Sequence, residues 1–123
     1  MDVDGGVAMT SVEGKNVFLS GPMTGLQDWN RKAFMRADKS VEMFGAAYIY
    51  NPAEHIEELE GFSHGMCMRV SLQRLCSICH GNPFIYGVLV SLPGWENSSG
   101  ACLERTVAKA CGMEVCNIED VIA

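Results

Sequence analysis

The chain has 123 residues, of which 48% are hydrophobic and 20% charged; this composition fits one globular domain and excludes a disordered protein. Its formal net charge of −6 disfavours nucleic acid polymers and membranes as partners, although backbone amides can still bind a small phosphorylated ligand. No membrane-spanning run or signal sequence is present, and six cysteines beside a normal core are typical of reduced thiols, so we expect a cytoplasmic protein.

The first third of the chain predicts a tail, a strand and a helix. Residues 1–14 are acidic and glycine-rich, and we expect a flexible tail ahead of one domain over residues 15–123. Asn16–Ser20 is a β-branched and aromatic run that predicts a strand, because glycine and proline follow it. Apolar residues then recur every three or four positions as far as Gly45, which predicts one helical face: Leu26, Trp29, Ala33, Phe34, Ala37, Val41 and Phe44.

The rest of the chain alternates strands with helices. Residues 54–65 interrupt this alternation and predict a loop with one helical turn. Alternating elements imply right-handed crossovers, so we predict a single flavodoxin-like or Rossmann-like three-layer α/β domain around a mostly parallel sheet. The other predicted elements are a strand over 46–50, a helix over 66–79, a central strand over 84–92, a helix over 101–111, a strand over 113–116 and a turn or helix over 118–122.

Two loops follow predicted strands and open helices, at the edge where ligands bind in open α/β sheets. The first loop is either a tight turn or a phosphate or sugar cradle, because its glycines allow close backbone approach. It comprises Ser20, Gly21, Pro22, Met23, Thr24 and Gly25.

The second loop spans residues 92–100. Ser98 or Ser99 can cap the helix that follows, and Trp95 offers an indole that can stack on a base or simply pack in the core. Glu104 is expected in the first turn of that helix, where free amides would keep its carboxylate ionised. The alternative interpretation of Glu104 is compensation of the helix dipole.

These paired motifs, Gly-Pro-Met-Thr-Gly at 21–25 and Leu-Pro-Gly-Trp-Glu-x-Ser-x-Gly-Ala at 92–101, resemble the nucleoside 2-deoxyribosyltransferase superfamily, and most closely a small family of phage and bacterial proteins. The resemblance covers residues 16 to 116. It implies a doubly wound sheet, no cofactor, a nucleoside or nucleotide as small-molecule partner, and a homo-oligomer whose subunits complete one another's pockets.

The resemblance also implies roles for single residues. Glu104 stands at the position of the glutamate that attacks the anomeric carbon of a 2-deoxyribosyl group and displaces the base. Ser98 and Gly100 match positions at the 5′ end or phosphate of the substrate. The positions beneath the sugar and phosphate are matched by Ser20, Gly21, Pro22 and Met23.

The sequence departs from the family pattern at several places, among them a longer stretch over residues 80–86 that lacks the usual aspartate before the central strand. The first loop lacks the arginine of the nucleotide-hydrolysing relatives, and Ser71 replaces an aspartate that positions the sugar or handles a proton. Serine cannot act as a carboxylate base. Asn51 and Glu54 follow the second predicted strand and could edge the pocket, and Glu54 or Glu96 could supply the missing carboxylate.

The cysteines allow two further interpretations. Cys76-Ser-Ile-Cys-His80 matches the haem-attachment pattern, and Cys67, Cys76, Cys79 and His80, or His64, could in principle bind zinc. Only one Cys-x-x-Cys pair is present and no export signal accompanies it, so we expect small core residues and no metal.

The sequence therefore predicts cleavage or transfer of a nucleoside or deoxynucleotide N-glycosidic bond through a glutamyl-sugar intermediate at Glu104. The alternatives are a catalytically weak or inactive nucleotide-binding module that uses the same pocket, which Ser71 favours, and a plain interaction protein.

Overall fold

The central sheet has four parallel strands, in a computed structural model that describes residues 9–78 and 87–123. Its strands are β2 (Asn16–Ser20), β3 (Tyr48–Tyr50), β4 (Gly87–Ser91) and β5 (Glu114–Asn117). The strand order is β3-β2-β4-β5, and each neighbouring pair is parallel. This arrangement confirms the predicted α/β domain with a parallel sheet.

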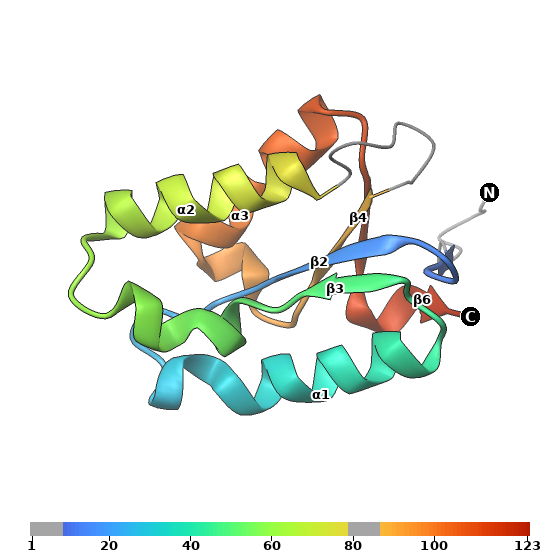
Figure 1. The fold of residues 1–123 in the computed structure, drawn as a ribbon, viewed down its shortest axis with the longest axis horizontal. Helices are drawn as coiled ribbons and strands as arrows, with labels where there is room; N and C mark the ends of the chain where they lie inside the picture. Colours follow the sequence, from blue (N-terminus) through green and yellow to red (C-terminus); the bar gives the residue numbers. More distant parts are fainter. Residues whose placement is uncertain (1–8, 79–86) are drawn as a thin grey trace.

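Three α-helices connect these strands and enclose the sheet in three layers (Figure 1). Helix α1 (Arg31–Met43) lies on one face, and α2 (His64–Ser77) and α3 (Ser99–Ala110) lie side by side on the other. The chain leaves β2 in one direction to reach β3, then crosses back over β2 to reach β4. The strand order therefore reverses between β2 and β4, where open α/β sheets bind their ligands.

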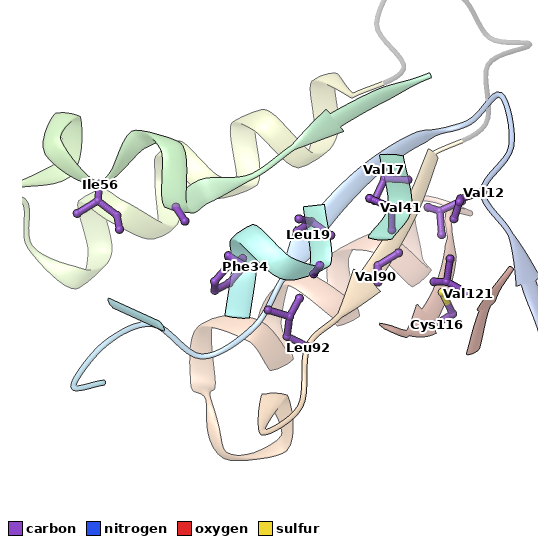
Figure 2. Close-up of a cluster of buried hydrophobic side chains, with 13 residues drawn as sticks. Val12, Val17, Leu19, Phe34, Val41, Ile56, Val90, Leu92, Cys116 and Val121 are labelled. Carbon is purple, nitrogen blue, oxygen red and sulfur yellow. The ribbon is translucent and has the colours of Figure 1, made fainter. Parts of the chain in front are cut away.

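The face under α1 holds an apolar core (Figure 2). Phe34, Ala37 and Val41 of α1 are buried, as the helical spacing predicted, and they pack over alternate residues of β2 and β4. The opposite face has a second cluster beneath α2 and α3, which includes Phe18, Tyr50, Leu75 and Leu89. All five residues of β4 are buried, as expected for a central strand covered on both faces.

Part of the predicted tail belongs to the fold. Strand β1 (Thr10–Ser11) pairs in parallel with β6 (Val121–Ile122), and Val12 is fully buried in the core under α1. The prediction failed for residues 10–12 because a two-residue strand leaves no periodicity to read. The last part of the chain forms a 3-10 helix, Ile118–Asp120, and then β6.

Helix α1 begins later than its apolar pattern predicted. Asp28, Trp29 and Asn30 have left-handed backbone angles (φ 49°, 56° and 63°), which no right-handed helix contains. These three residues belong to the segment η1 (Gln27–Asn30), which precedes α1. Trp29 is 45% exposed and is not buried on the helix face. The helix ends as predicted, because Gly45 takes the left-handed conformation (φ 96°).

The remaining elements lie close to their predicted positions. The interval predicted as a loop holds an eight-residue 3-10 segment, η2 (Pro52–Leu59), and Ser63 caps α2 by accepting a hydrogen bond from the Met66 amide. Residues 84–86 of the predicted central strand lie outside the described residues. Within the described part of the chain, no helix is long and apolar enough to cross a membrane.

Candidate active site

The last residues of β2 and β4 are both serines, and they lie next to each other. Ser20 and Ser91 are register partners on neighbouring strands, and both are buried. The two segments are still hydrogen-bonded one residue beyond β4, because the Leu92 amide donates to the Ser20 carbonyl over 2.8 Å. The two sequence motifs therefore leave the sheet together at its carboxyl edge.

The motif loops touch each other through their glycines. A Cβ on Gly21 would lie 2.8 Å from Cβ of Leu92, closer than carbon atoms approach, so only glycine fits there. A Cβ on Gly94 would lie 3.4 Å from Cγ of Pro22, and Gly94 also has a left-handed φ of 89°. The glycines of the first loop were predicted to allow close approach to its backbone, and in the structure the second loop makes that approach.

The rest of the first loop faces outward or packs on the core. Met23 packs against the core under α1, and Thr24 and Gly25 are exposed. The Asn30 side-chain amide donates to the Pro22 carbonyl over 3.0 Å, which fixes the loop against η1. We therefore find Ser20 pointing into the site, while Thr24 and Gly25 lie at its outer rim.

Glu104 projects from α3 toward the end of β2 and toward α2. The Ser20 hydroxyl donates to its Oε1 over 2.6 Å, and the Ser71 hydroxyl donates to its Oε2. The side chains come from three elements that are far apart in sequence, β2, α2 and α3. Each carboxyl oxygen is therefore held by one hydroxyl, which fixes the orientation of the group.

Ser71 reaches Glu104 because α2 and α3 pack closely. A Cβ on Gly100 would lie 3.1 Å from Sδ of Met68, tighter than ordinary side-chain contacts. Gly100 thus has a packing role between the helices, besides any role toward a ligand. Ser71, where the resemblance implies an aspartate, lies in direct contact with Glu104, the predicted nucleophile.

The electrostatic environment of Glu104 differs from the prediction. Glu104 is the sixth residue of α3 and not in its first turn, where the helix amides are unpaired. Burial raises the pKa of the Glu104 carboxyl above its ordinary value, and the bonds from Ser20 and Ser71 oppose this by lowering it. The hydroxyls, rather than the helix amides, therefore favour the ionised form.

Of the two candidate caps for α3, Ser98 and Ser99, the structure uses Ser98. Its hydroxyl accepts a hydrogen bond from the Ala101 amide over 3.2 Å. The Ser98 side chain therefore has a structural partner in the described protein, at a position where the resemblance implies a substrate contact.

Trp95 lies in the 3-10 segment η3 (Trp95–Asn97), and one face of its ring is covered. The guanidinium carbon of Arg105 lies 3.8 Å from the ring centroid, and Nη1 of Arg105 donates to the Ser91 hydroxyl over 2.7 Å. Arg105 and Ser91 were missed from the sequence. A basic residue on the same inward side of the predicted helix as Ala101 and Ala108, both buried, was the signal that could have identified Arg105.

Asn51 and Glu54 lie beside the other strand end and do not join the cluster around Glu104. The buried Asn51 side chain accepts from the Ala53 amide over 2.9 Å and donates to Asp38 over 3.0 Å, so it caps η2. Glu54 is exposed, as is Glu96. The hydrogen-bond partners of Glu104 among the described residues are the two serine hydroxyls alone.

The described cysteines are free thiols, and they are less buried than predicted. Of the five, Cys116 is buried, Cys67 and Cys102 are partly buried, and Cys76 and Cys111 are exposed. Cys79 and His80, on which the haem and zinc interpretations depend, lie outside the described residues. Among residues 9–78 and 87–123, no three His, Cys, Asp or Glu side chains converge to hold a metal ion.

Comparison with known proteins gives one match. A family model described as "Domain of unknown function (DUF4406)" matches residues 15–117. No curated protein and no solved structure matches the chain. The matched interval contains β2 to β5 and every residue of the site described above.

Proposed function

The chain belongs to the DUF4406 family, and from its own site we propose that it cleaves or transfers the N-glycosidic bond of a nucleoside or deoxynucleotide, with Glu104 as the nucleophile. One observation carries this proposal: a carboxyl group oriented by two hydroxyls stands at the carboxyl end of β2, where the strand order reverses. In open α/β sheets, ligands bind beyond the carboxyl ends of the strands at such a reversal.

The reaction proceeds in two displacements. An oxygen of Glu104 attacks the anomeric carbon, the bond from that carbon to the base nitrogen breaks, and its electron pair leaves with the base. In the second step, water or an acceptor base attacks the same carbon and loses a proton to solvent, and the ester bond to Glu104 breaks to regenerate the carboxylate. Water gives hydrolysis, and an acceptor base gives transfer.

The serines act on the nucleophile and not on the sugar. The Ser20 and Ser71 hydroxyls stabilise the charged carboxylate in a partly buried position, where burial alone favours the neutral acid. Because the partners of Glu104 among the described residues are hydroxyls, we propose that the departing base takes its proton from water. The carboxyl must be ionised to attack, so the rate rises as the pH increases through the raised pKa of Glu104.

The test is release of free base. The purified protein is incubated with each 2′-deoxynucleoside and its 5′-monophosphate, and base is quantified by chromatography. Glu104→Gln keeps the shape of the side chain and removes the nucleophile, so base release should fall by roughly 10³-fold or more. Mass spectrometry of the quenched reaction should find one sugar attached to the peptide that contains Glu104.

The matched control is Glu42→Gln, an exposed glutamate of α1, which should leave the rate unchanged. Equal base release by the Glu104→Gln variant and the parent protein would contradict the proposal. So would a sugar adduct on any other residue.

A second candidate function is a nucleotide-binding module without turnover. Ser71 favours it, because a hydroxyl stands where the resemblance implies an aspartate, and no carboxyl among the described side chains bonds to Glu104. Thermal unfolding distinguishes the two candidates: ligand binding raises the midpoint in either case, but only the enzyme releases base.

A further inference from the structure

Arg105 lies beside Glu104 at the carboxyl edge of the sheet, without a carboxylate of its own. Among the described residues, no acidic side chain lies within ion-pair distance of Arg105, whereas Lys15 and Arg31 both have such partners. A guanidinium carries five N–H donors, and one hydrogen bond, from Nη1 to Ser91, is formed with the described protein. Donors at Nε and Nη2 of Arg105 thus remain for another acceptor.

The position of this cation is fixed from two sides. Ser91 is fully buried and holds Nη1, and the Trp95 ring lies 3.8 Å from the guanidinium carbon. Stacking on an aromatic ring and one hydrogen bond keep the guanidinium plane in place, so little freedom is lost when a ligand binds. This is a pre-organised cation on a chain whose net charge is −6.

The cation is also close to the proposed nucleophile. Ser20 holds Glu104 and Ser91 holds Arg105, and these two serines are register partners on adjacent strands. Adjacent strands lie about 4.8 Å apart, so a single small substrate can contact both side chains. The carboxyl and the guanidinium do not form an ion pair with each other, which leaves both available to that substrate.

We propose that Arg105 forms a cationic subsite for an oxyanion of the substrate, held next to the carbon that Glu104 attacks; this rests on the proposed function. Arginine is suited to the task because its planar fork can donate two parallel hydrogen bonds to phosphate or carboxylate oxygens. The subsite selects an anionic substrate over the neutral nucleoside.

The test measures binding separately from turnover. In the Glu104→Gln background, calorimetry compares three probes: a 2′-deoxynucleoside, its 5′-monophosphate and inorganic phosphate. We expect the monophosphate to bind roughly 10- to 100-fold more tightly than the nucleoside, the range given by charge-assisted hydrogen bonds. Arg105→Gln, added to that background, should reduce this preference to about threefold or less while the nucleoside still binds.

Lys109→Gln is the matched control, since it removes the same charge from an exposed position of the same helix and should retain the preference. Added salt should also weaken the preference in the protein that keeps Arg105 and have little effect after Arg105→Gln, a response that a purely structural role would not give. Equal affinity for nucleoside and monophosphate, or a preference that survives Arg105→Gln, overturns the inference and leaves nucleoside turnover intact. Phosphate binding without any nucleoside binding overturns it as well, because the anion site is then separate from the proposed substrate site.

Discussion

Neighbouring residues of one strand enter two different environments. Leu19 of β2 points toward α1 and is fully buried in the apolar core (Figure 2). Ser20, the next residue, points toward α2 and α3 and donates to Glu104. Strand β4 repeats the arrangement: Val90 lies in the core, and Ser91 holds Arg105. The face under α1 is apolar to the end of the strands, while the opposite face becomes polar at its carboxyl edge.

The comparison teaches that stability and chemistry are separated by the pleat of the strands. Side chains alternate between faces, so one residue can serve the core while the next serves the site. The serines that end β2 and β4 are tolerated because each has a partner: Ser20 donates to Glu104, and Ser91 accepts from Arg105. Variants on the two faces should therefore have different effects, and the following predictions test that separation.

The largest effect is expected from Leu19→Ala. Removing this fully buried side chain leaves a cavity under α1 and should lower the free energy of unfolding by about 2–5 kcal/mol. Ser20→Ala, one residue along the chain, removes one hydrogen bond and should cost about 1 kcal/mol. Urea unfolding followed by circular dichroism measures both values.

Base release should rank the same two variants in the opposite order. Ser20→Ala removes a bond that lowers the pKa of Glu104, so its rate at neutral pH should fall and its pH profile should move to higher pH. Folded Leu19→Ala, assayed below its unfolding midpoint, should keep the parent profile. If Ser20→Ala is the less stable of the two, or leaves the profile unmoved, the division between the faces is wrong.

A smaller effect, with a definite sign, is expected from the pH dependence of stability. Burial raises the folded-state pKa of Glu104 above its ordinary value of 4.5, so the folded protein holds this proton more tightly than the unfolded chain. The stability contributed by this group is fully present below pH 4.5 and is lost as the pH rises through the raised pKa.

Glu104→Gln removes this titration. The parent and the variant should unfold at similar temperatures in acid, and the variant should become the more stable of the two as the pH rises. Thermal unfolding across the pH series measures the difference, with exposed Glu42→Gln as the control that should show no such trend. A difference that stays constant with pH would show that the group does not titrate as the structure indicates.

The order of the elements and the two motif loops could be predicted from the sequence, because hydrophobic period and glycine-proline breaks are local signals. The buried face of α1 followed from the spacing of Phe34, Ala37 and Val41. Trp29 fits the same spacing but is 45% exposed, because three left-handed residues precede the helix. Left-handed backbone conformations do not change the spacing of apolar residues, so this spacing cannot predict them.

The site itself was only half predictable. Glu104 and Ser20 were named from their motifs, but the bond between them joins residues 84 positions apart and depends on how α3 lies over the sheet. Arg105 is next to Glu104 in sequence, yet its contacts with Ser91 and Trp95 arise only once the second loop folds back on α3. Long-range packing, and not residue type, decides which polar side chains meet.

The smallest effect is expected from replacing the serines that cap α2 and α3. These variants test whether each serine only caps its helix or also contacts the ligand. Ser63 caps α2 and Ser98 caps α3, each by accepting one backbone amide bond over 3.2 Å. Replacing either serine by alanine should therefore cost about 1 kcal/mol of stability, measured by urea unfolding. Their effects on ligand affinity should differ, because Ser98 follows the motif loop that carries Trp95, whereas Ser63 is exposed and belongs to neither motif loop. We expect Ser98→Ala to weaken nucleotide binding several-fold and Ser63→Ala to leave it unchanged; equal affinities in the two variants would mean that Ser98 acts as a cap and nothing more.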